Sequence, residues 1–211
     1  MTRTQKTVFA LVALVAVVFG LTVHKVLNGR SHGDPAAMID AGIILLPQSR
    51  DLPSLSLTDQ NGQAVQVDEL KGQWSLLFFG YTFCPDICPT TLAQLRELKT
   101  LLPPEALSRL RVVLVSVDPQ RDTPTQLKQY LGYFDPAFQG LTGELENIQK
   151  LANAVSIPFI PANTSKPNYT VDHSGNLVII GPDGTQRGFI RSPLNNQKLA
   201  TQLPELLKSD G

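Results

Sequence analysis

The sequence predicts an α/β domain with a mixed central β-sheet flanked by helices. Between about residue 74 and residue 155, short apolar runs alternate with helical patterns, as is typical of strands joined by helices. The chain then continues with two short runs around a Gly-Pro-Asp-Gly turn and a last helical pattern. This ending predicts an antiparallel hairpin, added to the sheet and followed by a helix.

The domain is expected to begin with a β-hairpin over residues 55–58 and 64–67. Asn61 and Gly62 lie between these two runs, and Asn-Gly is a strong signal of a tight turn between strands. Residues 74–79 then form an apolar run that is typical of a buried strand. A hairpin that leads into the central sheet is therefore predicted at the start of the domain.

The first long helix is predicted over residues 90–102. Pro89 precedes it, and proline is tolerated at a first helical position because the N–H group there has no partner within the helix. Pro103 and Pro104 end the pattern, since proline cannot continue a helix. The apolar and β-branched residues 111–117 then predict the next buried strand.

Three helices and a second hairpin complete the prediction. Thr123 is expected to cap a helix over residues 124–133, with Pro124 at its first position. Residues 144–155 also show a helical pattern. The remaining expected elements are a hairpin over residues 177–180 and 186–191 and a closing helix over residues 196–207. The resulting order of strand, helix, strand, helix, hairpin and helix is thioredoxin-like.

The two cysteines of the chain, Cys84 and Cys88, lie at the turn between the strand at 74–79 and the first long helix. Pro85 restrains Cys84 to extended geometry, and the start of a helix favours a thiolate at Cys88. Such a pair can bind a soft metal, exchange disulfides, or form an inert structural disulfide. A disulfide that closes so short a ring gains little from loop entropy.

The N-terminus predicts a membrane anchor. Residues 8–23 are apolar apart from Thr22 and would span roughly 24 Å as a helix, so Lys6 and Lys25 would have to reach toward the two membrane surfaces. No convincing cleavage site follows, which favours an anchor that is retained. The basic residues before the apolar run favour a cytoplasmic N-terminus.

This pattern divides the chain into three parts: an anchor over residues 1–29, a tether over residues 30–50 and one domain over residues 51–211. The domain would lie outside the cytoplasm. Because no long Arg- and Ser-rich presequence is present, we expect a bacterial inner membrane protein with its soluble domain in the periplasm.

Composition excludes several functions. The chain has 18 Lys and Arg against 18 Asp and Glu, with no run of basic residues outside the flanks of the apolar segment. It therefore lacks the basic surface expected of a nucleic acid-binding protein. It also lacks the glycine-rich loops that bind phosphate groups.

His173 precedes the last hairpin and could lie near the cysteines in the predicted sheet. Two thiolates and one imidazole suit copper, because soft thiolates select Cu(I) and imidazole is acceptable to both oxidation states. A structural zinc site usually has four ligands, and no fourth ligand is obvious. A lone histidine is more often a structural or surface residue, so the residues alone leave its role open.

Several segments together resemble the Sco/SenC family of membrane-anchored, thioredoxin-like copper proteins of cytochrome c oxidase assembly. The resemblance runs from about residue 51 to residue 206 and is carried by residues 80–92, 117–124, 141–143, 169–173 and 180–184. It implies that Cys84, Cys88 and His173 bind one copper ion, Cu(I) or Cu(II).

The resemblance implies a metallochaperone that assists assembly of the dinuclear copper A centre of oxidase subunit II. The alternative is a thiol-disulfide reductase that keeps the cysteines of that centre reduced. Implied partners are subunit II, a copper donor protein and a thiol reductant. A C-x-x-x-C pair without a stacking Trp favours metal handling over dithiol exchange, so we expect the chain not to be an enzyme. Trp74 is expected in the core, and Tyr81 and Phe83 are expected to shield the site or to meet a partner.

Four aspartates are further candidates. Asp86 lies between the thiols and could tune the site or steer a basic partner, or it is a solvated turn residue. Asp172 could orient His173, as carboxylates often do for metal-bound imidazoles, or it serves a turn. Asp118 and Asp122 are expected to organise the turn and cap that follow the strand at 111–117.

Overall fold

The computed structural model describes residues 3–28, 34–166 and 168–208. The chain forms two compact units, Met1–Pro35 and Ala36–Gly211. The first unit contains the helix α1 (Arg3–Asn28), whose residues 12–23 are exposed. Among the described residues, no helix combines the length and the apolar character needed to cross a membrane. The predicted anchor includes residues outside the described set, and it stays a prediction.

The second unit is built around one eight-stranded sheet with the order β1-β8-β7-β4-β5-β6-β2-β3. Its strands are β1 (Ile43–Asp51), β2 (Ser56–Asp59), β3 (Ala64–Gln66), β4 (Trp74–Gly80), β5 (Leu110–Ser116), β6 (Gln139–Thr142), β7 (Leu177–Ile180) and β8 (Thr185–Ile190). The strand β4 pairs in parallel with β5 and antiparallel with β7. The sheet is therefore mixed, which confirms the predicted fold class.

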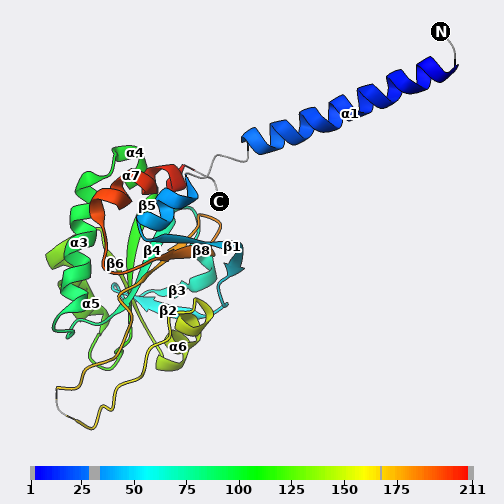
Figure 1. Cartoon of the computed structure of the whole chain (residues 1–211). Helices are drawn as coiled ribbons and strands as arrows, with labels where there is room; N and C mark the ends of the chain where they lie inside the picture. Colours follow the sequence, from blue (N-terminus) through cyan, green and yellow to red (C-terminus); the bar gives the residue numbers. More distant parts are fainter. Residues whose placement is uncertain (1–2, 29–33, 167, 209–211) are drawn as a thin grey trace. The chain divides into compact units, whose positions relative to one another are not determined.

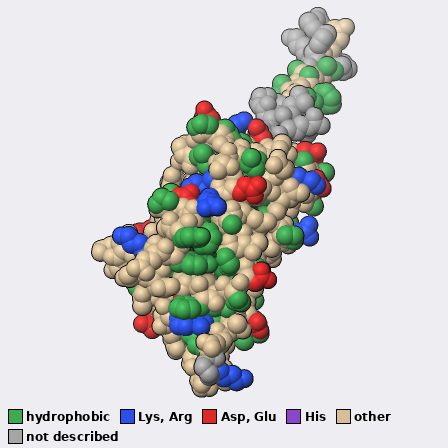
Figure 2. Space-filling model, turned by 90° about the vertical axis from the view of Figure 1, so that its left-hand side faces the viewer, with side chains coloured by type: hydrophobic (Ala, Val, Ile, Leu, Met, Phe, Trp, Pro, Cys, Tyr) green, Lys and Arg blue, Asp and Glu red, His purple; other side chains and the backbone are tan. Residues whose placement is uncertain are grey.

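Helices cover both faces of this sheet. They are α2 (Pro35–Asp40), the short 3₁₀ helix η1 (Val67–Glu69), α3 (Ile87–Leu101), α4 (Pro104–Ser108), α5 (Pro124–Phe134), α6 (Leu145–Ala154) and α7 (Asn196–Leu207). The helices α3, α5 and α7 lie on one side and α6 lies on the other (Figure 1). The face with α3 and α5 carries an apolar patch among charged side chains (Figure 2).

The core is centred on β4, in which all seven residues are buried. Trp74 is among them, as the sequence predicts. On α3, Leu92, Leu95 and Leu98 are buried against this layer, at the spacing that places residues on one helix face. Because neighbouring parallel strands end at the same edge of a sheet, the turns after β4 and β5 lie beside each other.

Residues 30–50 differ from the predicted tether. Those that the structure describes include α2 and β1, and β1 pairs with β8 through Ile43 and Leu45. The register of this pairing shifts between Leu45 and Arg50, and Pro47 lies within the shift. Proline cannot donate to a strand ladder and is confined to edge strands and bulges. The presence of Pro47 therefore makes this edge strand hard to recognise from the sequence.

Two hairpins appear as predicted, β2 with β3 and β7 with β8. The hydroxyl of Thr123 accepts a hydrogen bond from the N–H of Gln126 at 3.2 Å, so the predicted cap of α5 is also confirmed. The helix α3 begins at Ile87, which is earlier than expected, and Cys88 lies inside its first turn. The short elements α4, β6 and η1 were not predicted.

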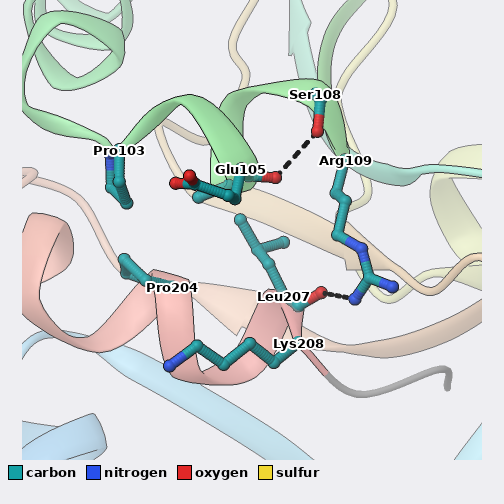
Figure 3. Close-up of a pocket in the computed structure, with 8 residues that line it drawn as sticks. Pro103, Glu105, Ser108, Arg109, Pro204, Leu207 and Lys208 are labelled. Atoms are coloured by element: carbon teal, nitrogen blue, oxygen red, sulfur yellow. Dashed lines mark hydrogen bonds between the residues drawn. The ribbon is translucent and has the colours of Figure 1, made fainter.

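A pocket of about 710 Å³ lies between α4 and α7 (Figure 3). Arg109 crosses it and donates a hydrogen bond to the carbonyl oxygen of Leu207 at 2.7 Å. Since Arg109 directly precedes β5, this pocket is at the opposite end of the sheet from the turn that follows β4. None of the predicted ligands lines it.

Candidate metal centre

The two cysteines lie on the segment that joins β4 to α3, here named the cysteine loop (residues 81–88). It follows a fully buried strand and runs into the first turn of α3. Cys88 is completely buried, whereas Cys84 is half-buried. Both thiols are free in the structure. One sulfur is therefore fixed in the core, and the other lies closer to solvent.

Gly80, the last residue of β4, makes room for the buried sulfur. A Cβ atom at this position would lie 2.7 Å from the Sγ atom of Cys88 and 2.9 Å from the ring of Phe78. Any larger residue would displace one of them. The sequence analysis did not single out Gly80, although a glycine that ends an apolar strand is a signal of close approach.

Backbone N–H groups point at both sulfurs. The N–H of Tyr81 donates to the Sγ atom of Cys88 at 3.4 Å. The N–H of Cys88, in the first turn of α3, donates to the Sγ atom of Cys84 at 3.5 Å. The start of the helix therefore stabilises negative charge on Cys84, rather than on Cys88 as the sequence suggested.

The two thiols consequently differ in acidity. A hydrogen bond from the Cys88 thiol lowers the pKa of Cys84 to about 4. Burial raises this pKa, while hydrogen bonds from the N–H groups of Asp86 and Cys88 and from the ring of His173 lower it further. The pKa of Cys88 is raised, first by that same hydrogen bond and then by burial. The metal-free pair thus holds one thiolate on Cys84 and one thiol on Cys88.

His173 reaches the cysteines from the histidine segment (residues 155–176), which joins α6 to β7. Its Nε2 atom lies 3.3 Å from the Sγ atom of Cys88. Its Nδ1 atom lies 3.3 Å from the carbonyl oxygen of Ser174, which could accept the Nδ1 proton when Nε2 binds a metal. The imidazole meets the rings of Tyr81 and Phe78 edge-on, with centroid distances of 5.5 and 6.0 Å.

The ligand atoms of Cys84, Cys88 and His173 all lie within 4.8 Å of one another. This spacing suits a single ion, because bonds from a metal to sulfur or nitrogen are about 2.0–2.3 Å long. Within the described residues, no fourth His, Cys, Asp or Glu side chain joins the group. Two sulfurs and one imidazole fit copper better than a four-coordinate structural zinc.

Asp122 ties the cysteine loop to the end of β5. Its buried carboxylate accepts hydrogen bonds from the N–H of Thr82 at 3.1 Å, the hydroxyl of Thr82 at 2.7 Å and the hydroxyl of Ser116 at 2.7 Å. Burial raises the pKa of Asp122, while these hydrogen bonds oppose the rise. Asp122 therefore organises the turn after β5, as predicted, and also holds the neighbouring loop.

Asp118 and Arg121 contact the histidine segment. The hydroxyl of Tyr169 donates to Asp118 at 2.8 Å, and the Nε atom of Arg121 forms an ion pair with the same carboxylate. An Nη atom of Arg121 donates to the carbonyl oxygen of Tyr169 at 3.0 Å. The N–H of Val171 donates to the hydroxyl of Tyr81 at 3.2 Å. Sequence reasoning did not single out Arg121, which lies between two candidate aspartates.

Asp86 and Asp172 have smaller roles than the sequence allowed. Asp86 is exposed at the start of α3, where its side chain makes no capping hydrogen bond. Asp172 is also exposed, and its backbone pairs with Ile160 in an isolated bridge. The contact with the Nδ1 atom of His173 comes from the Ser174 carbonyl. Of the two residues expected to shield the site, Tyr81 is buried beside His173, while Phe83 is 53% exposed.

Fold and site together define a thioredoxin-like domain with a two-cysteine, one-histidine metal site at its first strand-to-helix turn. The family model described as SCO1/SenC matches residues 48–208. The chain therefore belongs to the SCO1/SenC family.

Similar proteins share most of this domain. A protein of Stutzerimonas stutzeri, whose name proposes that it binds copper, is 49% identical over 178 residues, which are 84% of this chain and 87% of that protein. The structure of Bradyrhizobium japonicum ScoI with copper bound is 35% identical, with a TM-score of 0.64. The similarity covers 72% of this chain and 97% of that one.

A more distant structure shows the same fold. It is that of BsSco, described as a member of the Sco family of cytochrome c oxidase assembly proteins with a disulfide switch. It is 22% identical, with a TM-score of 0.61, and the similarity covers 77% of this chain and 96% of that one. At this identity, the comparison supports the fold alone.

Proposed function

We propose that this protein is a copper metallochaperone that binds one copper ion through Cys84, Cys88 and His173. The observation that carries the proposal is the convergence of these three ligand atoms within 4.8 Å. Two soft sulfurs and one imidazole are a ligand set that accepts copper in both oxidation states. The copper-bound relative of similar structure supports the same metal.

The exposure of the ligands suits transfer of the ion. Cys88 is buried, whereas Cys84 and His173 are half-buried. A ligand from another protein could therefore approach the ion from the side of Cys84 while Cys88 still holds it. A three-ligand site also leaves room for an incoming ligand, which a closed four-coordinate site would not.

The recipient that we propose is the dinuclear copper A centre of cytochrome c oxidase subunit II. The family resemblance implies this partner, and the membership of the chain in the SCO1/SenC family agrees with it. Copper would come from a donor protein, and a thiol reductant would keep Cys84 and Cys88 reduced before loading.

The proposal is tested by an anaerobic copper titration of the reduced protein beside the variant His173→Ala. We expect the unchanged protein to bind one copper per chain, with Cu(II)–thiolate charge-transfer bands that the variant loses. Asp86→Asn is a matched control, because Asp86 is exposed between the cysteines and makes no capping bond. Copper binding by His173→Ala with unchanged affinity and spectrum would refute the three-ligand site.

A second candidate function is thiol-disulfide reduction, favoured by the half-buried position of Cys84 next to the free thiol of Cys88. Cys84 would attack a disulfide of the copper A centre, and Cys88 would then displace the target sulfur. The target gains two thiols, and this pair becomes a disulfide. The assay is reduction of an oxidised copper A domain, in which His173→Ala should remain active. Failure to reduce that domain under any redox conditions would exclude this function.

Attachment to a bacterial inner membrane through residues 1–29, with the domain in the periplasm, is a separate proposal that rests on the sequence. Its support is the pair of basic residues Arg3 and Lys6 before the apolar residues 8–23. Fractionation of cells that produce the full chain tests it. We expect the protein in the membrane fraction and accessible to protease in spheroplasts, and recovery in the soluble fraction would contradict the proposal.

A further inference from the structure

The metal ligands come from two different segments, so the site needs contacts that hold these segments together. The cysteine loop is built into β4 and α3. Within its described residues, the histidine segment contains no helix or strand, and its one β-bridge is the isolated bridge between Ile160 and Asp172. Side-chain contacts must therefore set how closely His173 approaches the sulfurs.

Arg121 makes the densest set of these contacts. Its guanidinium lies 3.7 Å from the centroid of the Tyr169 ring, and it donates to the carbonyl oxygen of the same residue at 3.0 Å. It also lies 4.9 Å from the centroid of the Phe83 ring and 5.6 Å from the centroid of the Tyr81 ring. One side chain thus contacts both the histidine segment and the cysteine loop.

Asp118 completes this arrangement. Its carboxylate pairs with the Nε atom of Arg121 and accepts a hydrogen bond from the hydroxyl of Tyr169 at 2.8 Å. Because Asp118 is buried and paired, Arg121 does not act as a free surface cation. Tyr169 is held at its ring, its hydroxyl and its carbonyl oxygen, all by groups that follow β5.

We propose that Arg121 is a positioning residue for the metal site. It holds Tyr169 against the cysteine loop and thereby fixes the approach of His173 to Cys84 and Cys88. Four residues of extended chain span at most about 14 Å, so a fixed Tyr169 restricts where His173 can lie. The proposal rests on the proposed metal-binding function of these ligands.

The geometry requires an arginine. The planar guanidinium donates from Nε to Asp118 and from an Nη atom to Tyr169 while its face covers the Tyr169 ring. A lysine keeps the charge but has neither the fork of donors nor the stacking face. If Arg121 positions His173, Arg121→Lys should therefore behave like Arg121→Gln. If it acts only through its charge, Arg121→Lys should behave like the unchanged protein.

The test compares copper binding by Arg121→Gln and Arg121→Lys with the unchanged protein. Removal of a group that orients a metal ligand typically weakens affinity roughly 10- to 100-fold, and we expect that loss in both variants, with a changed Cu(II) spin-resonance spectrum. Arg187→Gln is the matched control. Arg187 pairs with Asp183 at 2.6 Å in the hairpin at the other end of the sheet, and its loss should leave affinity and spectrum unchanged.

A double mutant separates positioning from a general effect on the fold. If Arg121 acts through His173, then Arg121→Gln should weaken copper binding no further in a protein that already carries His173→Ala. Additive losses, a normal spectrum in Arg121→Gln or full recovery in Arg121→Lys would each overturn the proposal. Should Arg121→Gln fail to fold, Tyr169→Leu replaces it, because it removes the ring that the Arg121 guanidinium covers. Unchanged affinity and spectrum in that variant would also overturn the proposal.

Two separate measurements test the metallochaperone proposal and the positioning role of Arg121. If the unchanged protein binds no copper, the metallochaperone proposal fails. The imidazole NMR signals of His173 in the reduced, metal-free protein then decide the positioning role. They should be sharp and single in the unchanged protein and in Arg187→Gln, but shifted or broadened in both Arg121 variants. Identical signals in all four proteins would overturn the inference.

Discussion

The cysteine loop and the histidine segment hold their ligands in different ways. The cysteine loop follows a strand with seven buried residues, and Asp122 fastens it to the end of β5. The histidine segment instead relies on a few side-chain contacts, chiefly at Tyr169 and Val171. Its residue Ile160 is 67% exposed. The sulfur ligands therefore lie on a segment that is anchored to the core, while the nitrogen ligand depends on a less constrained segment.

This difference indicates an order for metal release. Local opening of a structure begins where few buried contacts and few backbone hydrogen bonds hold the chain. We therefore expect a bound ion to lose the imidazole of His173 before it loses either sulfur. A two-sulfur intermediate would remain, with Cys88 in the core and Cys84 facing the recipient.

The largest expected effect concerns the two sulfurs themselves. In the reduced, metal-free protein, Cys84 should be alkylated at least about a hundredfold faster than Cys88 at neutral pH, because each unit of pKa changes the thiolate fraction about tenfold. The lowered pKa keeps Cys84 ionised above about pH 4. Its alkylation rate should therefore stay level on acidification to about pH 5 and fall near pH 4.

Mass spectrometry of the alkylated protein measures both rates, with Cys84→Ser as the control for reaction at Cys88. A rate at Cys84 that rises about tenfold per pH unit around neutrality, as for an ordinary thiol, would contradict this prediction.

The next effect concerns the hydrogen bonds to Asp122 that hold the cysteine loop. Asp122→Ala should lower the free energy of unfolding by about 3 kcal/mol, because it leaves the donors of half-buried Thr82 and buried Ser116 without their charged acceptor. Asp122→Asn keeps the shape and one acceptor oxygen, so it should cost only about 1 kcal/mol. Urea denaturation measures both values. Losses well below about 1 kcal/mol in both variants would show that the hydrogen bonds to Asp122 contribute little.

Gly80→Ala should also disturb the cysteine loop, through a steric clash with Cys88 and not through a lost hydrogen bond. The added Cβ atom would lie 2.7 Å from the Sγ atom of Cys88, and overpacking of this kind costs about 1–3 kcal/mol. The affinity of the variant for copper should fall together with its free energy of unfolding. Gly132→Ala on α5 is the control, because a Cβ atom there meets nothing within 4 Å and should stabilise the helix by about 0.5–1 kcal/mol. Thermal unfolding compares them, and a Gly80→Ala protein as stable as the unchanged one would refute the packing argument.

The smallest effect is expected at the hydrogen bond from the N–H of Val171 to the hydroxyl of Tyr81, which also holds the histidine segment. Tyr81→Phe keeps the ring beside His173 but removes the acceptor for the N–H of Val171, at a cost of about 1 kcal/mol. Hydrogen exchange should become faster at Val171 and stay the same in β4. Unchanged exchange at Val171 would mean that this hydrogen bond does not restrain the segment.

Much of the fold follows from patterns in the sequence. Apolar runs mark β4 and β5, and turn residues mark the two hairpins. The strand β6 was missed because its four residues include Gly140, which is required by packing: a Cβ atom there would lie 2.8 Å from Leu131. The helix α4 was missed because Pro103 and Pro104 were interpreted only as the end of α3, although proline also suits the first position of the next helix.

The site was predicted less completely than the fold. Spacing and turn chemistry identify Cys84 and Cys88, but the role of His173 depended on the family resemblance, since no local pattern connects it to the cysteines. Gly80 and Arg121 lie within segments that carry the resemblance, but nothing in those segments indicates what either residue contacts. Their importance arises from contacts between segments that are distant in the sequence, and such contacts appear only in the folded protein.

The irregular edge strand β1 affects how readily the sheet can pair with strands of other molecules. Both edges of the sheet would be open to pairing with strands of other molecules, and such pairing leads to aggregation. One edge is β3, which has only three residues. The other is β1, where Pro47 removes a donor, the register shifts, and Arg50 and Asp51 are exposed charges. The proline that makes this strand hard to recognise in the sequence thus also disfavours pairing of this edge with a strand of another molecule.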